Sequence, residues 1–433
     1  MDTELKQKDI YKTSRIMYVL WAAFEYFITI MVSGAYLAKV TTSLGVSDST
    51  TALISSASTF AGAFQIIAIF LAHKTPVKWW VTTLQFIYQM LLSGVYIIAL
   101  FGFKSNAGLI IFLIIFVAFV IKDIMQPVRQ TWFVNMMDNK KIGLISAITV
   151  CISLIGGMAF NFGLSKVIDS YEAAGNLKGA FIIITVLISL LTVLNLITML
   201  LSREKKAEGN SHTSALLEVG NLLKNKSYVG FLFASTLLQM SIALISPFLS
   251  TYQIGELGFS MTFISIIGII NSSVQAVVIY CLGRFSVNHS LLNVFKLGFL
   301  IYPITFLLNV FTVPANGKVM MIIFGLVNVV ASASISVGYN YLFTITHENE
   351  RTAALALRSV FIGTVSFLTT LLATPLFNYI KETCGSVIFG KTIYAQQVLA
   401  AISTLICSIA TVYIFTRYSK LAKKQRELEK YID

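Results

Sequence analysis

Charged residues are scarce in this chain. Asp, Glu, Lys and Arg make up 12% of the 433 residues and hydrophobic residues 56%, with a mean hydropathy of +0.80. This composition excludes a soluble protein with a large core and indicates a polytopic membrane protein. Acidic residues are fewer than basic ones, which gives a formal net charge of +13. Basic cytoplasmic loops of membrane proteins explain that excess, so we expect no nucleic-acid partner.

Cysteine and histidine are also rare, with four of each. The cysteines are scattered, which argues against a disulfide framework or a metal cluster. They are Cys151, Cys281, Cys384 and Cys407. Neither an HExxH motif nor a paired CxxC motif is present, which argues against an intramembrane protease. We therefore predict a protein that is not an enzyme and that holds no metal and no cofactor.

Twelve apolar runs are long enough to span a bilayer. They cover approximately residues 16–39, 50–72, 79–102, 107–136, 142–168, 178–201, 228–252, 260–282, 291–312, 318–343, 352–380 and 393–416. One long polar stretch separates the sixth run from the seventh, and its second part is a short amphipathic helix suited to the membrane surface. We predict an N-terminal six-helix bundle over 1–201, a cytoplasmic linker over 202–227, and a C-terminal six-helix bundle with a basic cytoplasmic tail over 228–433.

The distribution of Lys and Arg predicts the orientation. If both termini are cytoplasmic, the inner segments hold 21 of these residues and the outer loops hold seven. Cytoplasmic loops carry such an excess. We therefore expect a multi-pass protein of the plasma membrane with both termini in the cytoplasm.

The fourth run carries the most unusual residues, Lys122, Asp123 and Arg129, next to Pro127. A charge at the centre of a bilayer costs at least about 2.5 kcal/mol, so such residues usually face a protein interior or a watery cavity. Proline removes one backbone donor, which predicts a kink and leaves the carbonyl of Asp123 without its helical partner. The alternative is that Lys122 and Arg129 lie near the cytoplasmic end and extend to the surface.

The second half of the chain repeats features of the first. The segment WFVNMMDNKKIGLISAI from Trp132 corresponds to LFTITHENERTAALALRSV from Leu342, which relates Lys141 to Arg351 with an offset of 210 residues. Internal repeats of helix bundles place the substrate near the midplane, between the two halves.

The chain resembles the major facilitator superfamily of secondary transporters. The resemblance rests on this repeat, on the two sets of six spans and on the segment PFLSTYQIGELGFSMTFISII from Pro247. The resemblance implies an all-α integral membrane protein with twelve transmembrane helices in two six-helix bundles. It also implies that helices one, four, seven and ten line the central cavity. The loop after helix two keeps the family's basic residues, His73, Lys74 and Lys78, but lacks their acidic partner.

One face of the first helix is polar: Tyr18, Glu25, Thr29, Ser33 and Tyr36 follow one another at helical spacing. Glu25 is a mid-span carboxylate that an apolar setting can make reversibly protonated. The alternative is a Glu that permanently hydrogen-bonds a neighbouring helix. We expect Glu25 and Asp123 to couple transport to protons.

The remaining candidates lie on helices four, seven and ten, where small polar stripes can instead serve helix packing. The predicted substrate-binding residues are Tyr36, Lys122, Asp123, Gln126, Arg129, Gln239, Asn328, Tyr339 and Asn340. Arg358 on helix eleven pairs with a carbonyl or carboxylate, or marks the inner mouth.

These features predict a proton-coupled transporter of a small polar organic solute, either a sugar or glycoside or an organic anion, which works by alternating access as a monomer among membrane lipids. A multidrug or metabolite exporter is the second hypothesis. A membrane receptor and a lipid flippase are lower alternatives. A receptor would need a soluble signalling module, for which the longest loop is too short, and a flippase would need a lateral, amphiphilic cavity.

We predict that both termini and the linker are cytoplasmic. A single cysteine introduced as Asn210→Cys or Gln425→Cys into a cysteine-free background is therefore expected to resist a membrane-impermeant maleimide in intact cells. The same variants are expected to react after the membrane is permeabilised. Efficient labelling before permeabilisation would contradict this topology.

Overall fold

The computed structural model describes residues 11–67, 77–103, 106–136, 142–204, 215–288, 290–346, 350–383, 387–388 and 391–421. The helices are α1 (Lys12–Met31), α2 (Gly34–Ser43), α3 (Asp48–Ala61), α5 (Lys78–Phe101), α6 (Ala107–Asn135), α7 (Ile142–Ala173), α8 (Leu177–Leu201), α9 (Ala215–Lys224), α10 (Lys226–Thr251), α11 (Met261–Asn288), α12 (Leu291–Val310), α13 (Gly317–Gly338), α14 (Arg351–Thr383) and α15 (Ala395–Tyr413). Four short segments with other helical geometry extend them: η1 (Gly62–Ile66), η2 (Tyr252–Glu256), η3 (Tyr339–Thr344) and η5 (Ile414–Tyr418).

The expected all-α membrane fold is confirmed. Ten helices in the described part of the chain are long and apolar enough to cross a membrane, or eleven if the bent pair α1 and α2 counts as one span. The predicted second span begins as α3 and η1, and the end of that prediction lies outside the described residues. A two-stranded antiparallel hairpin, β1 (Val387–Ile388) with β2 (Lys391–Thr392), precedes α15.

The prediction of one unbroken first helix over 16–39 is wrong. The helix stops at Met31, Ser33 is extended, and α2 begins at Gly34 after a bend of 40°. Gly34 has a φ of +52°, a left-handed conformation that glycine adopts without steric cost. Because of this break, Tyr36 does not continue the polar face that Glu25 and Thr29 begin.

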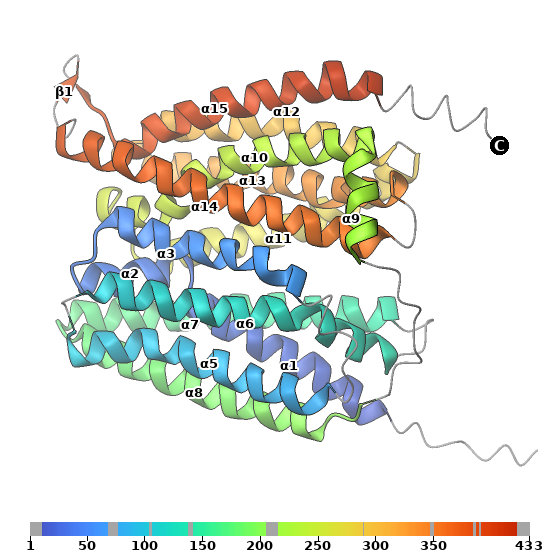
Figure 1. Ribbon diagram of the computed structural model, residues 1–433. Helices are drawn as coiled ribbons and strands as arrows, with labels where there is room; N and C mark the ends of the chain where they lie inside the picture. Colours follow the sequence, from blue (N-terminus) through green and yellow to red (C-terminus); the bar gives the residue numbers. More distant parts are fainter. Residues whose placement is uncertain are drawn as a thin grey trace, which may run out of the picture.

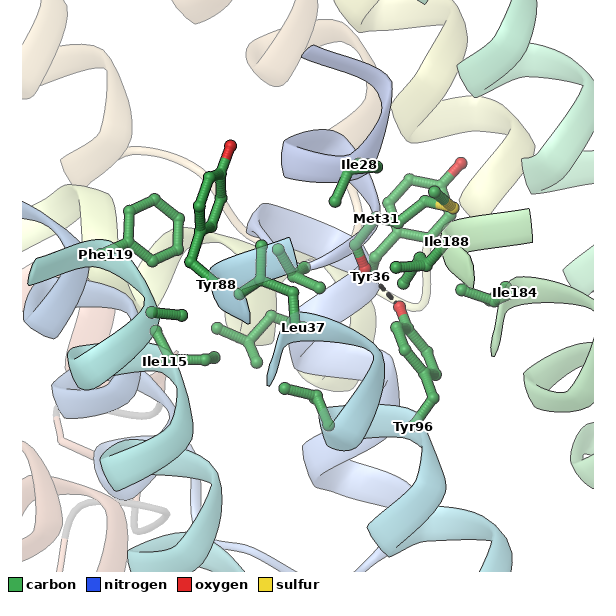
Figure 2. Packing of buried hydrophobic residues seen from close by; sticks show 14 of the residues in the cluster. Ile28, Met31, Tyr36, Leu37, Tyr88, Tyr96, Ile115, Phe119, Ile184 and Ile188 are labelled. Carbon is green, nitrogen blue, oxygen red and sulfur yellow. Dashed lines mark hydrogen bonds between the residues drawn. The ribbon is translucent and has the colours of Figure 1, made fainter. Parts of the chain in front are cut away.

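Helices α1 to α8 form one layer and α10 to α15 another (Figure 1), and we call these the N-terminal and C-terminal halves. Each half has its own apolar core. In the N-terminal half, Met31, Leu37, Tyr88 and Ile115 belong to one cluster of buried residues, and the Tyr96 hydroxyl donates to the carbonyl of Met31 (Figure 2). Separate cores allow each half to move as a rigid unit.

The start of α1, the end of the α15 region and the predicted amphipathic helix, found as α9, all lie at one end of the molecule (Figure 1). We call this the terminal end, and the opposite one the far end. Helix α9 packs on the C-terminal half through Leu222, which is fully buried. The boundaries predicted for the two bundles and the linker remain predictions.

Polar contacts join the halves at the far end. The carboxylate of Asp169, near the end of α7, accepts hydrogen bonds from the backbone N–H groups of Met261 (3.0 Å) and Thr262 (2.8 Å) in the first turn of α11. Such a cap satisfies donors that a helix start otherwise leaves free and favours a negative charge. Lys381 of α14 also forms an ion pair with Asp48 of α3.

Close backbone packing adds to these contacts nearer the middle. A Cβ atom at Gly363 of α14 would lie 2.7 Å from the carbonyl oxygen of Thr59 in α3, so a larger residue would push the halves apart. Next to it, the rings of Phe60 and Phe367 stack with centroids 4.7 Å apart. The halves are therefore held together from the middle to the far end.

We predict that Asp169 holds the far end closed. Losing a capping carboxylate costs about 1 kcal/mol, so Asp169→Ala is expected to shift the populations of closed and open forms about fivefold. The measurement is the reaction rate of Ser265→Cys, near this contact, with a water-soluble maleimide. Glu172→Ala is the control, because it removes only the exposed ion pair with Lys39. Equal rates in both backgrounds would contradict the prediction.

Candidate functional site

A cavity of about 410 Å³ opens in the N-terminal half, among α1, α6 and α7. Its lining residues come from most of α1, from the second half of α6 and from the first half of α7. They are Tyr18, Trp21, Ala22, Glu25, Tyr26, Thr29, Lys122, Gln126, Arg129, Gln130, Thr149, Val150, Ser153 and Leu154. The cavity therefore brings Lys122 and Arg129 of the fourth predicted span together with the carboxylate of Glu25 in the first.

An ion pair between Glu25 and Arg129 forms the centre of this site. Arg129 Nη1 lies 3.0 Å from one carboxylate oxygen of Glu25, and Nη2 donates to the other at 3.2 Å. Both side chains are buried, and each residue is 7% exposed. A two-point guanidinium–carboxylate contact is among the stronger pairings available to these groups. The alternative in which Arg129 merely extends to the membrane surface is excluded by this geometry.

Neighbouring groups fix the orientation of the pair. Arg129 Nη1 also donates to Gln85 Oε1 of α5 at 2.7 Å, and Gln85 Nε2 donates to the Tyr88 hydroxyl at 3.1 Å. The guanidinium lies 4.1 Å from the ring centroid of Trp21, a favourable cation–π position. These contacts hold the Arg129 side chain from both sides and leave it little freedom.

Lys122 is held less tightly. Its ammonium lies 3.9 Å from a carboxylate oxygen of Glu25, beyond hydrogen-bond distance, and 5.1 Å from the ring centroid of Phe119. Its side chain is 19% exposed, against 8% for Arg129. One carboxylate thus faces two cations, and Lys122 is the cation with donors left for a ligand.

The other predicted residues of the fourth helix divide between two faces. Gln126 lines the cavity beside Lys122 and Arg129. Asp123 points instead towards η1, where its Oδ2 lies 3.9 Å from the position a Cβ at Gly62 would occupy. Helix α6 continues through Pro127 without interruption to Asn135. Asp123 and Lys122 therefore have different surroundings, as their neighbouring positions on a helix require.

Tyr36 lies in a separate hydrogen-bond network. Its hydroxyl contacts the Asn161 side chain at 2.7 Å and the Ser165 hydroxyl at 3.0 Å, and Ser165 reaches Ser265 of α11 at 2.9 Å. These contacts join α2 and α7 to the C-terminal half. This geometry favours a role for Tyr36 between the halves.

Gln239 lines a second cavity, of about 350 Å³, between the two halves. Its walls come from α2 and α3 on one side and α10 and α14 on the other. Hydroxyl groups dominate the lining, including Ser55, Ser56, Thr59, Ser246, Ser250 and Ser366. Gln239 Nε2 donates to the Ser366 hydroxyl at 3.2 Å. This cavity lies at the position expected for the substrate site of an internal repeat.

Three predicted residues on helix ten lie apart from both cavities. Asn328 is half-buried within α13, and Asn340 is exposed, its amide donating to the Val337 carbonyl at 3.1 Å. The guanidinium carbon of Arg358 lies 3.5 Å from the ring centroid of Tyr339. The polar stripe of helix ten therefore includes members with structural contacts of their own.

Sequence reasoning missed Gln85 and Trp21 as parts of the site. Gln85 is fully inside α5, 1% exposed, and a lone Gln in an apolar helix gives no sign of which charge it contacts. The ring centroid of Trp21 lies 4.1 Å from the guanidinium of Arg129. The spacing of four residues between Trp21 and Glu25 places both on one face and could have revealed it.

Two other kinds of site find no support. The described residues contain no group of three or more His, Cys, Asp or Glu side chains that could hold a metal. The letters GSVIFGKT from Gly385 to Thr392 fit the phosphate-binding pattern GxxxxGK[ST]. That pattern needs a strand, a loop and a helix start, whereas here Val387–Ile388 pairs with Lys391–Thr392 in a hairpin.

Comparison with known proteins relates this geometry to a family. Residues 231–431 match the model of the Major Facilitator Superfamily. A comparison with curated protein sequences gave no match.

Among solved structures, a variant of the nucleoside transporter NupG is similar over 93% of this chain and 99% of its own, with a TM-score of 0.73 and 14% identity. A bacterial homologue of the human lysosomal transporter Spinster, in an inward-facing and unoccupied conformation, is similar over 95% of this chain and 96% of its own. Its TM-score is 0.65 and its identity 13%. A POT family transporter in complex with 5-aminolevulinic acid is similar over 92% of this chain and 95% of its own, with a TM-score of 0.65 and 14% identity. The expected resemblance to this family and the expected all-α membrane fold are confirmed.

The buried pair predicts a strong coupling between Glu25 and Arg129. Arg129→Gln or Glu25→Gln alone leaves a buried charge without its partner, which is expected to cost about 3–5 kcal/mol of stability. The double variant is expected to be more stable than either single variant. Lys122→Gln, which removes a longer and wetter contact, is the control and is expected to cost less than about 1 kcal/mol. Melting temperatures of the purified proteins measure all four, and additive losses would contradict the coupling.

Proposed function

We propose that the protein is a proton-coupled secondary transporter of a small polar organic solute. The proposal is supported by the match of residues 231–431 to the family's model and by the likeness to solved transporters over 92–95% of the chain. The mechanism is alternating access, in which the two halves rock about the site between them. The observation that carries the proposal is the Glu25–Arg129–Lys122 cluster beside a cavity at membrane depth.

The cluster supplies a means of coupling. While Glu25 is ionised, it holds Arg129 and attracts Lys122. A proton on Glu25 removes the negative charge, so both cations lose their partner and gain affinity for a polar or anionic group of the solute. Conversely, a bound anionic group competes with Glu25 for the cations and favours its protonation. Proton and solute therefore bind together, as a symporter requires.

The second cavity suits the rest of the solute. Its hydroxyl and amide groups, including Gln239 and Ser366, offer both donors and acceptors to a neutral polar body. Because its walls belong to both halves, a solute bound there contacts both and responds to their relative motion. Charged residues in one cavity and hydroxyls in the other favour a polar solute over the apolar compounds of a multidrug exporter.

The solved structures of similar fold give candidate solute classes. Their names specify nucleosides, peptides and 5-aminolevulinic acid, all small and polar. The charge cluster favours solutes that carry a carboxylate, or a carboxylate with an amine, over neutral sugars. We propose that the protein works as a monomer in the plasma membrane, with its terminal end in the cytoplasm.

The described contacts between the halves fit a state that is open to the cytoplasm. Asp169 and Asp48 contact the C-terminal half at the far end. The segments of α6 and α7 that line the charged cavity belong to the halves of these helices nearer the terminal end. A solute can therefore reach Lys122 from the cytoplasmic side while the outer side is closed.

The test is transport by purified protein in liposomes, after a thermal-shift screen of nucleosides, short peptides, amino acids, organic acids and sugars has identified a ligand. Ligands that bind the folded state raise its melting temperature. We predict that an inward proton gradient drives accumulation of that ligand in the wild type.

Glu25→Gln is expected to abolish gradient-driven accumulation and to retain exchange, because exchange does not require release of a proton. Lys122→Gln is expected to weaken binding about tenfold, the loss of one charge-assisted hydrogen bond. Lys39→Gln is the control, since Lys39 pairs with Glu172 outside the cavity. Accumulation in Glu25→Gln at the wild-type level would refute the coupling role.

A further inference from the structure

A second cation at membrane depth lies in the C-terminal half. Arg358 is in the second turn of α14, within a helix that qualifies as a membrane span from Ala353 to Glu382. Its guanidinium carbon lies 3.5 Å from the ring centroid of Tyr339, at the junction of α13 and η3. Arg358 therefore packs on an aromatic ring of the same half, and its side chain is half-buried.

This guanidinium has no counter-charge among the residues that the structure describes. Its Nε is buried and has no hydrogen-bond partner, and no described carboxylate forms an ion pair with Arg358. A cation in a membrane span is costly unless a partner compensates it, and Arg129 has such a partner in Glu25. The cation–π contact with Tyr339 compensates only part of that cost.

The surroundings of Arg358 resemble those of Arg129. Adding the repeat offset of 210 residues takes Arg129 to Tyr339, Tyr18 to Tyr228 and Glu25 to Ser235. Tyr228 donates to the Ala354 carbonyl at 2.9 Å, one helical turn before Arg358. The N-terminal half thus has a cation with a carboxylate, and the C-terminal half has a cation and, at the carboxylate's position, a serine.

The hydroxyl of Ser235 is a second buried polar group without a hydrogen-bond partner among the described residues of the C-terminal half. Ser235 itself is fully buried. It lies on the same face of α10 as Tyr228 and Phe231, whose ring lies 6.2 Å from that of Tyr339. Buried polar groups without partners are few in native proteins, and each calls for an explanation such as an absent ligand or water.

We propose that Arg358, supported by Tyr339, forms an oxyanion-binding subsite in the C-terminal half that takes a carboxylate or phosphate group of the transported solute. The guanidinium offers two parallel N–H donors, the arrangement that matches a carboxylate or phosphate. This subsite rests on the proposed function and deepens it. This subsite narrows the class of solute to compounds with an anionic group.

The test uses the purified full-length chain in detergent and two probes, succinate and inorganic phosphate, each compared with chloride at equal ionic strength. The readout is the melting temperature as a function of probe concentration. We expect at least one probe to stabilise the wild type, and Arg358→Gln to raise its half-saturating concentration about tenfold. Arg358→Lys keeps the charge without the paired donors and is expected to give an intermediate value.

Arg284→Gln is the matched control, because Arg284 is an exposed cation 5.2 Å from the Tyr280 ring in the same half. It is expected to leave the half-saturating concentration unchanged. An unchanged value in Arg358→Gln, or no stabilisation of the wild type by either probe, overturns the subsite. If Lys122→Gln alone abolishes the effect, the anion binds in the N-terminal cavity, so the subsite falls while the proposed function stands.

A second arm separates a solute from a lipid headgroup. The protein is placed in nanodiscs of phosphatidylcholine alone or with phosphatidylglycerol, and the same variants are compared. Stabilisation through Arg358 by phosphatidylglycerol, with no effect of succinate or phosphate, assigns the guanidinium to a lipid and overturns the proposal. Absence of gradient-driven accumulation by the wild type, with an intact anion effect, would instead contradict only the proposed proton coupling.

Discussion

The structure of the N-terminal half depends on the compensation of charge at membrane depth. Glu25 and Arg129 are buried together, and the pair is stable there only because each neutralises the other and Gln85 satisfies a remaining donor. Lys122 stays at the edge of this pair, 3.9 Å from the carboxylate. That geometry keeps α1, α5 and α6 in register and leaves one cation accessible from the cavity, so one set of contacts serves both folding and recognition.

The contacts between the two halves differ in kind from the contacts within each half. Within a half, large apolar side chains form a continuous core, as around Tyr88 and Ile115 (Figure 2). Between the halves, the contacts include a helix cap by Asp169, small residues such as Gly363 and a cavity lined by hydroxyls. Hydrogen bonds and small side chains can be exchanged for water or for other partners at modest cost, whereas a core cannot. This difference favours rocking of whole halves over deformation of either one.

The layout of the chain could be predicted from sequence because hydropathy depends on local composition alone. The spans and the amphipathic helix α9 followed from it. Glu25, Lys122 and Arg129 could be selected as candidate site residues because charges in apolar runs are few. Helix ten was harder to interpret. Asn328, Tyr339 and Asn340 share one polar stripe, but a stripe has the same spacing whether it faces a ligand, a neighbouring helix or its own backbone, as Asn340 does.

The sequence by itself therefore determined the membrane fold and which residues bear charge within apolar runs, because both follow from residue type and periodicity. Only the tertiary structure decided the pairing. Arg129, and not Lys122, is the close partner of Glu25, Gln85 joins them from α5, and the break at Gly34 turns Tyr36 to Asn161. These relations join residues on different helices, and their distances depend on helix packing angles and on one left-handed glycine, which no single segment specifies.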